Sequence, residues 1–487
     1  MTDQKNLGDM PSEEFKKFGH RLIDWAAGYL DNIESFPVLP DILPGDIKKQ
    51  LPSTAPMHGE PMSEIIADLD KIIVPGVTHW QHPNFMAYFN STSSGPAILG
   101  ELISAVFNTN GMVWKSNPAS TELEETVLNW FRDLIGLPEE YFGVVYDTGS
   151  VSSLHGIAAA RENIGVDVRN KGLCGLPKLR IYSTEHAHSS IDKAALTLGI
   201  GLDGICKVPS DSSFAMIPSE LKKFIDEDRS KGYLPFCVAA TIGTTSSTAV
   251  DPVNEIADIC GKENIWLHVD GAYAGVTALL PEKKKFFAGI ERADSFVVNP
   301  HKWLFVPVDF SILYTRKPEV LKRAFSLVPE YLKSPEDDLV INYMDYGVQL
   351  GRRFRAIKFW YVLRYFGVEG LQARIRENIR IASLFAQWVD LDPGFEKLAP
   401  VNFGTVCFRA HPEKINDEKT LNEINAKLLN NVNATGRIFI VNTKLNGKFT
   451  LRMVSSGLRT EERHVKLAWD VIVEEFNKIM REGKSEL

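Results

Sequence analysis

The sequence predicts an α/β fold: a large domain built on a mostly parallel β-sheet, with a helical N-terminal layer and a smaller C-terminal α+β domain. The alternation of segments and the composition of the strand-like runs predict the sheet. From about residue 120 helical and strand-like segments alternate, and the strand-like runs are short, apolar and rich in Val and Ile. Length is the third observation, because 487 residues suffice for one large domain and smaller ones. We place an N-terminal arm at 1–85, the large domain at 86–368 and the small domain at 369–487.

The N-terminal arm begins with an amphipathic helix over residues 12–34, for which Ser12 is the expected N-cap. A proline-rich stretch (36–56) and a second periodic segment (62–73) follow. Two helices joined by an extended segment cannot bury a core alone. The arm therefore packs either on its own domain or on a partner subunit, and periodicity does not distinguish these. The apolar stripe of the first helix consists of Phe15, Phe18, Leu22, Trp25, Ala26, Tyr29 and Ile33.

The elements of the two following domains are read in chain order. In the large domain we expect helices at 121–136 and 155–165 and strands at 142–147, 179–184, 235–243, 265–270, 294–299 and 310–315. A long helical stretch over 352–389 leads into the small domain. There we expect strands at 402–410, 437–443 and 449–456 and helices at 421–432 and 461–480.

Composition narrows the function classes. The net charge of −8 comes without a long basic run, so nothing favours nucleic acid as a partner, and we expect a small-molecule ligand. The five cysteines show no CxxC pair, which argues against a disulfide framework or a cysteine zinc site, and we expect no metal. The polar, acidic N-terminus and the lack of any apolar run of about twenty residues predict a cytoplasmic protein without a membrane span.

Three strand ends carry the residues of chemical interest. One strand ends at Asp270, the next is followed by Lys302, and the strand ending near residue 147 leads into a small-residue turn that opens a helix and includes Ser150 and Ser152. Ligands of parallel sheets bind beyond the carboxyl ends of the strands, so these groups converge on one edge. Taken singly, each has an ordinary explanation: a solvated lysine, a turn aspartate, an N-cap. Their joint occurrence in this order makes coincidence improbable.

This set of groups is what pyridoxal phosphate (PLP) chemistry requires. A lysine amine among apolar and aromatic neighbours can bind an aldehyde covalently, because its ammonium form is disfavoured there. Lys302 meets that need. A carboxylate such as Asp270 keeps a pyridine nitrogen protonated, so that the ring accepts electrons. A phosphate suits the backbone N–H groups and short hydroxyls at a helix N-terminus, which the turn at 149–152 supplies.

Several motifs resemble the group II PLP-dependent decarboxylases, and most closely the aromatic-L-amino-acid decarboxylases. They are TGSVSSLHGIAAAR, TEHAHSS, ATIGTT, HVDGAYAG, NPHKW, PEYLK and LGRRFR, with PGVTHWQHPNFMAYF and NPASTELE nearer the N-terminus. The resemblance covers nearly the whole chain. It implies the fold type I architecture with a seven-stranded sheet, an obligate homodimer with the active site near its interface, and an N-terminal layer that packs across subunits.

The resemblance also implies roles for individual residues. Lys302 would hold the cofactor aldehyde, Asp270 would pair with the pyridine nitrogen, and Ala272 and His188 would pack on opposite ring faces. Thr245 would lie near the ring and its 3-oxygen, whereas His186 is expected to be structural. The phosphate would be held by Ser150, the N–H of Val151, Ser152, Asn299 and His301.

A lid and a substrate pocket are implied in the same way. The polar segment 326–340 resembles a mobile lid whose Tyr331 protonates the substrate's alpha carbon. In the family, phenylalanine at that position goes with aldehyde synthases. Asn110 and Met112 stand where animal relatives carry apolar and aromatic groups, which predicts a more polar or differently shaped slot, and Gly351 would suit a phenolic ring. The substrate pocket would comprise Trp80, Tyr88, Phe89, Asn110, Met112, Leu350 and Gly351.

The sequence thus predicts decarboxylation of an L-amino acid, expected to be aromatic (tyrosine, DOPA, phenylalanine or tryptophan), to an amine and CO2. One alternative on the same scaffold is an aldehyde synthase, and another is a decarboxylase of a non-aromatic amino acid. An aminotransferase or desulfurase is a further alternative, against which His188 and Tyr331 argue. A non-catalytic protein is disfavoured because Lys302 and Asp270 are both present.

Overall fold

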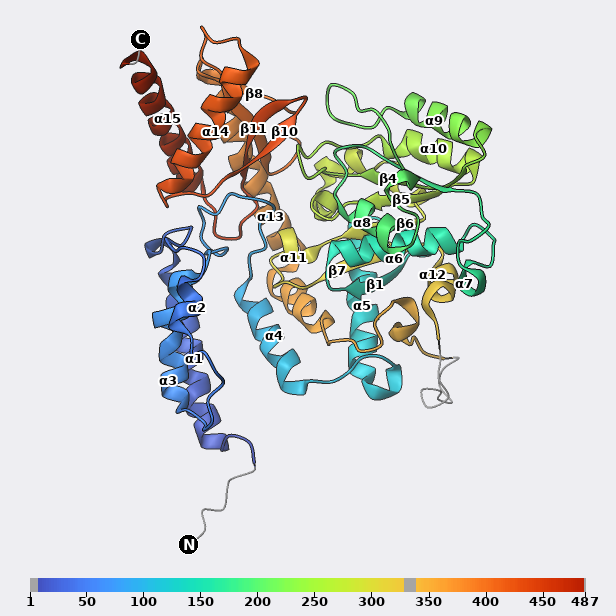
Figure 1. The fold of residues 1–487 in the computed structure, drawn as a ribbon. Coiled ribbons are helices and arrows are strands. Elements are labelled where there is room, and N and C mark those ends of the chain that lie inside the picture. Colours follow the sequence, from blue (N-terminus) through green and yellow to red (C-terminus); the bar gives the residue numbers. More distant parts are fainter. Residues whose placement is uncertain (1–7, 328–338, 486–487) are drawn as a thin grey trace.

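The computed structural model describes residues 8–327 and 339–485, and its N-terminal arm extends away from the body (Figure 1). The arm comprises α1 (Ser12–Asp31), α2 (Asp46–Gln50) and α3 (Met62–Asp68), followed by a π-helical turn (Leu69–Ile73). No residue of α1 is buried, and Phe15 on its apolar stripe is 61% exposed. The predicted N-cap is wrong by one residue. Pro11 is extended (φ −58°, ψ 144°) and precedes the helix, so Ser12 is its first residue and makes no capping bond.

A seven-stranded sheet forms the centre of the large domain. Its order is β1-β7-β6-β5-β4-β2-β3; only β7 runs antiparallel, against both β1 and β6. The predicted mostly parallel sheet is therefore confirmed, although the short edge strand β3 was not anticipated. The strands are β1 (Phe142–Tyr146), β2 (Leu179–Ser183), β3 (Ile205–Lys207), β4 (Leu234–Thr241), β5 (Trp266–Asp270), β6 (Ser295–Val298) and β7 (Ser311–Thr315).

Helices cover both faces of this sheet, which explains its continuous apolar strands. Val144 packs in one core with residues of α6, α8 and α12, while its neighbour Val145 packs on the other face with α5, α9, α10 and α13. Successive side chains of a strand point to opposite faces, so both must be apolar. The helices are α4 (Gly95–Phe107), α5 (Pro118–Ile135), α6 (Gly149–Glu162), α7 (Val168–Lys171), α8 (Ser190–Thr197), α9 (Pro218–Ser230), α10 (Val253–Glu263), α11 (Pro300–Trp303), α12 (Pro318–Phe325) and α13 (Ala356–Leu391).

The C-terminal part contains a four-stranded antiparallel sheet of order β10-β11-β9-β8, packed against α14 and α15. The strand predicted at 437–443 starts later, at Val441, because the backbone of the preceding residues bonds elsewhere: Phe439 N–H donates to Asn84 O, and Met86 N–H donates to Phe439 O. The elements are β8 (Phe395–Lys397), β9 (Thr405–Ala410), β10 (Val441–Leu445), β11 (Lys448–Val454), α14 (Glu418–Ala434) and α15 (Glu462–Ser485).

The long helix α13 links the two sheets. It packs on α4 and α5 and also on α15, β8 and β9, and non-helical backbone at Gly367 (φ 63°, ψ 176°) interrupts it near the predicted domain boundary. The division at residues 85 and 368 stays a prediction. Over the described ranges 8–327 and 339–485, no helix combines the length and apolarity that a membrane span needs.

Candidate active site

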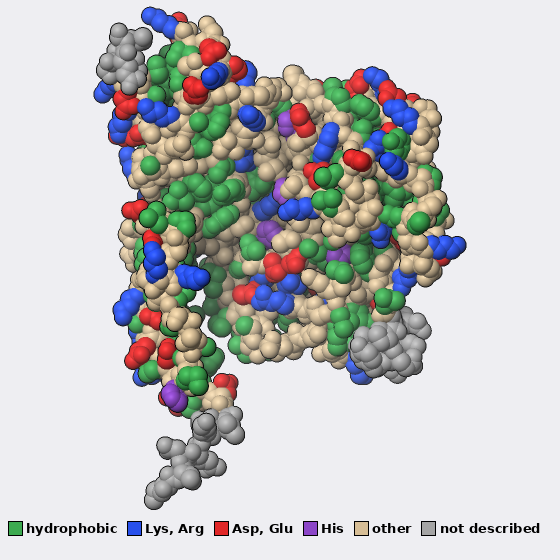
Figure 2. Space-filling model, in the orientation of Figure 1, with side chains coloured by type: hydrophobic (Ala, Val, Ile, Leu, Met, Phe, Trp, Pro, Cys, Tyr) green, Lys and Arg blue, Asp and Glu red, His purple; other side chains and the backbone are tan. Residues whose placement is uncertain are grey.

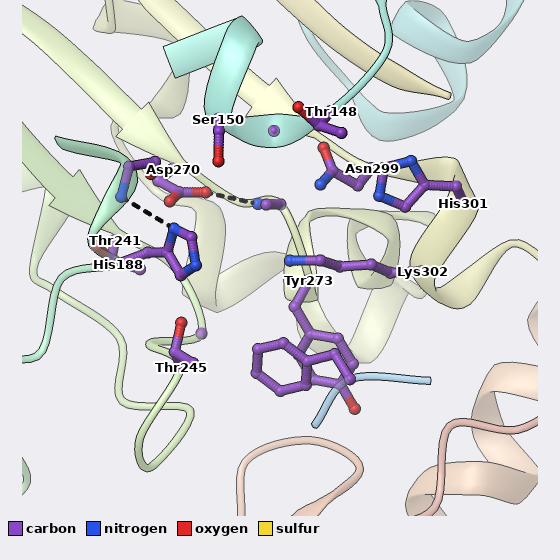
Figure 3. Close-up of a pocket in the computed structure, with 15 residues that line it drawn as sticks. Thr148, Ser150, His188, Thr241, Thr245, Asp270, Tyr273, Asn299, His301 and Lys302 are labelled. Carbon is purple, nitrogen blue, oxygen red and sulfur yellow. Dashed lines mark hydrogen bonds between the residues drawn. The ribbon is translucent and has the colours of Figure 1, made fainter. Parts of the chain in front are cut away.

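A pocket lies beyond the carboxyl ends of the large-sheet strands, where α6 and α11 begin (Figure 3). Among its walls are eight of the predicted cofactor residues, from the ends of five strands and the loops that follow them. The lining residues are Phe89, Thr148, Gly149, Ser150, His188, Ser190, Thr241, Gly243, Thr245, Asp270, Ala272, Tyr273, Asn299, His301 and Lys302.

Lys302 enters this pocket from the short helix α11. Strand β6 ends at Val298, and Pro300, which suits a first helical turn, starts the helix that carries the lysine. The Lys302 Nζ lies 5.2 Å from the centre of the Phe89 ring. Desolvation lowers the pKa of Lys302, and the nearby Asp270 carboxylate opposes this only in part. The neutral amine is the form that attacks a carbonyl carbon, and a lowered pKa increases the fraction of lysine in that form.

Asp270 ends β5, the strand beside β6, and pairs with Val297 in the sheet. It is 7% exposed, and its Oδ1 accepts a hydrogen bond from Ala272 N–H at 2.9 Å. That bond fixes the carboxylate at the strand end. Figure 3 shows the carboxylate facing the same cavity as the Lys302 amine. A carboxylate in this position can pair with a positively charged ring nitrogen.

His188 forms another wall and is held in one orientation by the backbone. Its Nδ1 lies 3.1 Å from Ser190 N and accepts that N–H, so Nδ1 carries no proton. Burial lowers the pKa of His188 against the opposing effect of Asp270. The imidazole is therefore neutral near pH 7, with its proton on Nε2. The neighbouring His186 does not line the pocket and packs edge-on against Phe214, in line with a structural role.

Away from Asp270 and His188, neutral hydrogen-bond donors surround the N-terminus of α6 at the other end of the pocket. The first residues of this 14-residue helix are Gly149 and Ser150, and Thr148 provides no side-chain cap. Gly149 is required here because an added Cβ would lie 2.7 Å from Asn299 Nδ2. Asn299 Oδ1 accepts the Ser311 hydroxyl at 2.7 Å, which directs its amide nitrogen away from Ser311. The helix dipole and these donors suit an anion.

His301 is a further neutral donor at this end. Its Nδ1 accepts the Phe310 N–H at 2.9 Å, so the proton of the neutral ring is on Nε2. Burial lowers the pKa of His301 to about 3. Its ring therefore donates a hydrogen bond without carrying charge over the whole neutral range.

Two predicted phosphate residues lie behind the pocket wall and do not line it. Ser152 is fully buried, and its hydroxyl lies 2.7 Å from the Ser311 hydroxyl, which in turn bonds Asn299. Val151 N–H donates to Thr148 O at 3.1 Å. Ser152 thus supports Asn299 from behind, whereas the N–H of Val151 is used within the first turn of α6.

The pocket also contains residues that the sequence did not single out: Thr148, Ser190, Thr241, Gly243 and Tyr273. Tyr273 stacks on Phe89, with ring centres 3.7 Å apart, and on Trp303 at 4.7 Å. Trp303 is fully buried and donates its Nε1–H to Asn378. The signal for Tyr273 was present, since it belongs to the HVDGAYAG motif that contains Asp270 and Ala272.

Of the predicted substrate residues, only Phe89 lines this pocket. Trp80 and Tyr88 stack on each other near the surface and are 37% and 50% exposed. Asn110 and Met112 bond the segment around residues 344–352: Asn110 Oδ1 accepts Arg352 N–H and Met112 O accepts Met344 N–H. Leu350 and Gly351 lie in the exposed part of that segment, residues 348–351. Their substrate role stays a prediction, and Tyr331 lies outside the described residues.

The chemistry of the pocket fits PLP. Neutral donors of Ser150, Asn299 and His301 at a helix N-terminus suit a phosphate, and no acidic side chain of the described residues lines that end. An amine of lowered pKa, Lys302, suits an aldehyde. The Asp270 carboxylate suits a protonated pyridine nitrogen.

Comparison with known proteins agrees with this assignment. Residues 44–411 match the model of the pyridoxal-dependent decarboxylase conserved domain. The chain is 38% identical to an aromatic-L-amino-acid decarboxylase of Catharanthus roseus (97% of this chain, 96% of that protein). It is 41% identical to a phenylacetaldehyde synthase of Arabidopsis thaliana (98% of each). The solved structure of Oryza sativa TDC with PLP and tryptamine superposes with a TM-score of 0.93 at 35% identity, covering 97% of this chain and 99% of that one. The chain therefore belongs to the pyridoxal-dependent decarboxylases and is a PLP enzyme of fold type I.

Proposed function

We propose that this enzyme decarboxylates an aromatic L-amino acid, such as tyrosine, DOPA, phenylalanine or tryptophan, to the corresponding amine and CO2. The observation that carries the proposal is the meeting of Lys302, Asp270 and His188 in one pocket whose other end suits a phosphate. The similarity to decarboxylases of aromatic amino acids supports the substrate class.

The cofactor, when bound, supplies an electron-accepting ring conjugated to the substrate's alpha carbon. In our proposal Lys302 would hold the aldehyde group of the cofactor. Asp270 keeps the ring nitrogen protonated, which favours electron flow into the ring. His188, neutral and fixed by the Ser190 N–H, packs on the ring and orients the substrate. The residues that line the pocket would orient the substrate so that its carboxylate is the group lost, which means that binding geometry would select the reaction.

The last step decides between the two products that the relatives' names suggest. We propose that Tyr331 protonates the alpha carbon and so gives an amine, an assignment that rests on resemblance alone. Without that proton O2 would take up the two electrons instead and water would release the aldehyde, so that the amino acid, O2 and H2O give aldehyde, CO2, ammonia and hydrogen peroxide. The 41% identity to a phenylacetaldehyde synthase makes this oxidative reaction the second candidate.

A product assay separates these candidates. Purified enzyme with added PLP is offered tyrosine, DOPA, phenylalanine, tryptophan, histidine and glutamate, and CO2, amine, aldehyde and peroxide are measured together. We expect equal amounts of CO2 and amine from an aromatic substrate. Equal amounts of CO2 and peroxide would instead establish the aldehyde synthase, and turnover of only histidine or glutamate would reject the aromatic substrate class.

The variant Tyr331→Phe tests the proton donor. We expect it to lose amine formation and to gain O2 consumption, while retaining PLP binding. Amine output equal to that of the unmodified enzyme would remove Tyr331 from the reaction.

We also propose that the enzyme is a cytoplasmic homodimer. Support comes from α4, where Leu102, Val106 and Phe107 are 45–61% exposed, and from the unburied apolar stripe of α1. Figure 2 shows hydrophobic side chains along the arm and in the hollow between it and the body. A second copy would cover these surfaces. Light scattering at micromolar concentration tests the homodimer, for which it should give twice the mass of the chain, and a monomeric mass would contradict it.

A further inference from the structure

The turn that carries Thr245 into the pocket is held from outside by the small domain. Arg452 on β11 and Cys407 on β9 are register partners in the antiparallel sheet. Arg452 Nε donates to the carbonyl oxygen of Ser246 at 3.0 Å, and Cys407 Sγ donates to the same oxygen at 3.3 Å. Ser246 directly follows Thr245. Two side chains of the small domain thus fix the peptide next to a pocket residue.

Among the described residues, the hydrogen bonds within this turn connect Thr244 and residues 247–249 and do not involve Thr245 or Ser246. Thr244 N–H donates to Ala249 O at 3.0 Å, Thr244 Oγ1 accepts Ala249 N–H at 3.0 Å, and Thr248 N–H donates to Thr244 O at 2.8 Å. These bonds close residues 244–249 into a loop but leave Thr245 and Ser246 at its tip. Thr245 is exposed to the pocket, whereas Thr244 and Ser247 are buried. The Ser246 carbonyl is therefore the point at which the tip is held.

Arg452 makes a second contact with the pocket, on a different wall. Its guanidinium carbon lies 5.3 Å from the centre of the Phe89 ring, the ring that stacks on Tyr273 and faces Lys302. A guanidinium at this distance attracts the ring through a cation–π interaction. One side chain of the small domain therefore contacts both Phe89 and the turn that carries Thr245.

The environment of Arg452 is unusual for a structural arginine. It is 4% exposed, and within the described part of the chain its Nη2 has no hydrogen-bond partner. Arg452 also interacts with the Cys407 thiol, so that its contacts with this thiol, the Ser246 carbonyl and the Phe89 ring are all with neutral groups, and burial lowers the pKa of the guanidinium. Burying a charge against neutral groups costs stability. Arg409 on β9 is buried to a similar degree (2% exposed) but pairs with Glu396 and Glu418.

We propose that Arg452 and Cys407 are positioning residues through which the small domain sets Thr245 and Phe89 in the cofactor pocket. Arg452 is the main one, because it bonds the turn and also contacts Phe89. The inference rests on the proposed function in that both walls then face PLP and the amino acid. Docking of the small domain is thereby coupled to the shape of the site.

The test compares Arg452→Gln with Arg409→Gln, a matched change in the same sheet. Hydrogen exchange in the cofactor-free protein is followed at residues 244–249, and PLP affinity, kcat and KM are measured separately. For Arg452→Gln we expect exchange in the turn to rise and PLP affinity to fall, each by about tenfold, the scale of one lost hydrogen bond to a charged group. Cys407→Ala should also raise exchange in the turn and lower PLP affinity, but by smaller factors than Arg452→Gln. Arg409→Gln should lower thermal stability while leaving the turn and PLP affinity unchanged.

Two results would overturn the proposal. Unchanged exchange in the turn with a raised KM for the amino acid would mean that Arg452 acts on the substrate directly. Equal effects of Arg452→Gln and Arg409→Gln on the turn would mean that both arginines are merely structural. The exchange measurement needs no turnover, so it stays informative if the unmodified enzyme binds PLP but forms no amine, a result that would reject the proposed function alone.

Discussion

The cofactor end and the predicted substrate surface of this enzyme are built in different ways. At the cofactor end, Asp270, Asn299 and His301 are each at most 7% exposed and are held by backbone or hydroxyl hydrogen bonds. At the predicted substrate surface, Trp80 and Tyr88 are 37% and 50% exposed and stack on each other. The side chains of the first region are fixed by hydrogen bonds within the chain, whereas the second presents aromatic rings to its surroundings. The fold thus fixes the residues that we propose hold the cofactor, whereas the rings that we propose select the substrate lie at the surface.

The largest effect should follow from Lys302→Ala. This change removes the amine that we propose holds the cofactor, so activity should fall on the order of 10⁴-fold or more, the scale of losing a covalent catalytic group. The visible absorbance of the covalently bound cofactor should disappear, while the thermal unfolding temperature stays close to that of the unmodified enzyme. Retained activity would refute the assignment of the cofactor end.

Asp270→Asn should come next. Loss of the carboxylate weakens electron withdrawal by the ring, so we expect kcat to fall by roughly 10²–10³-fold, as for other single electrostatic groups. Asp294→Asn is the control, because Asp294 is also 7% exposed but lies at the other end of the sheet, where it pairs with Lys317. That control should lower stability and spare kcat. A kcat that falls in Asp294→Asn but not in Asp270→Asn would contradict the role of Asp270.

Gly149→Ala should weaken cofactor binding. The added methyl group would lie 2.7 Å from Asn299 Nδ2 and displace a donor of the anion end. We expect PLP affinity to drop about tenfold, the scale of one lost hydrogen bond to a charged group. Gly261→Ala in α10 meets nothing within 4 Å and should leave affinity unchanged. Equal affinities of both variants would show that the phosphate binds elsewhere.

Tyr88→Ala tests the predicted substrate surface and should change substrate preference without changing cofactor binding. If the exposed rings select the substrate, its KM should change by up to about tenfold between aromatic amino acids, within the range of one pocket group. PLP affinity should stay the same. Tyr365→Ala, which removes an exposed tyrosine of α13, should change neither quantity. A loss of PLP affinity in Tyr88→Ala would erase the distinction between the two regions.

The smallest effect concerns pH. Burial lowers the pKa of His301 to about 3 and that of His268 to about 4, whereas an unfolded histidine titrates near 6.5. Between these values the unfolded chain binds more protons, so the free energy of unfolding decreases as the pH falls below 6.5. At pH 5.5 the loss should be about 1 kcal/mol for each such histidine. Thermal unfolding at pH 7.5 and 5.5 should show the decrease, and His268→Gln should reduce it. An unreduced decrease in that variant would contradict the shifted pKa of His268.

Much of the cofactor end could be predicted from the sequence, because motifs at strand ends carry its residues. Ser152 shows where such prediction stops. It follows Ser150 by two residues, about 200° around a helix, and therefore points to the sheet and bonds Ser311. Neither the shift of the strand near residue 440 nor the contact of Arg452 with Ser246 has a local signal, since both depend on segments distant in the chain. The predicted substrate residues lie far apart in the sequence, at 80–112 and 350–351, and no regular spacing connects them, so the sequence alone could not show whether they meet.

The most direct test of the account is to identify the lysine that holds the cofactor. The PLP-loaded enzyme is reduced with borohydride, digested, and searched by mass spectrometry for the lysine that carries the cofactor. The account predicts modification of Lys302 in the peptide that contains NPHKW. Modification of another buried lysine, such as Lys358, or of none would contradict it.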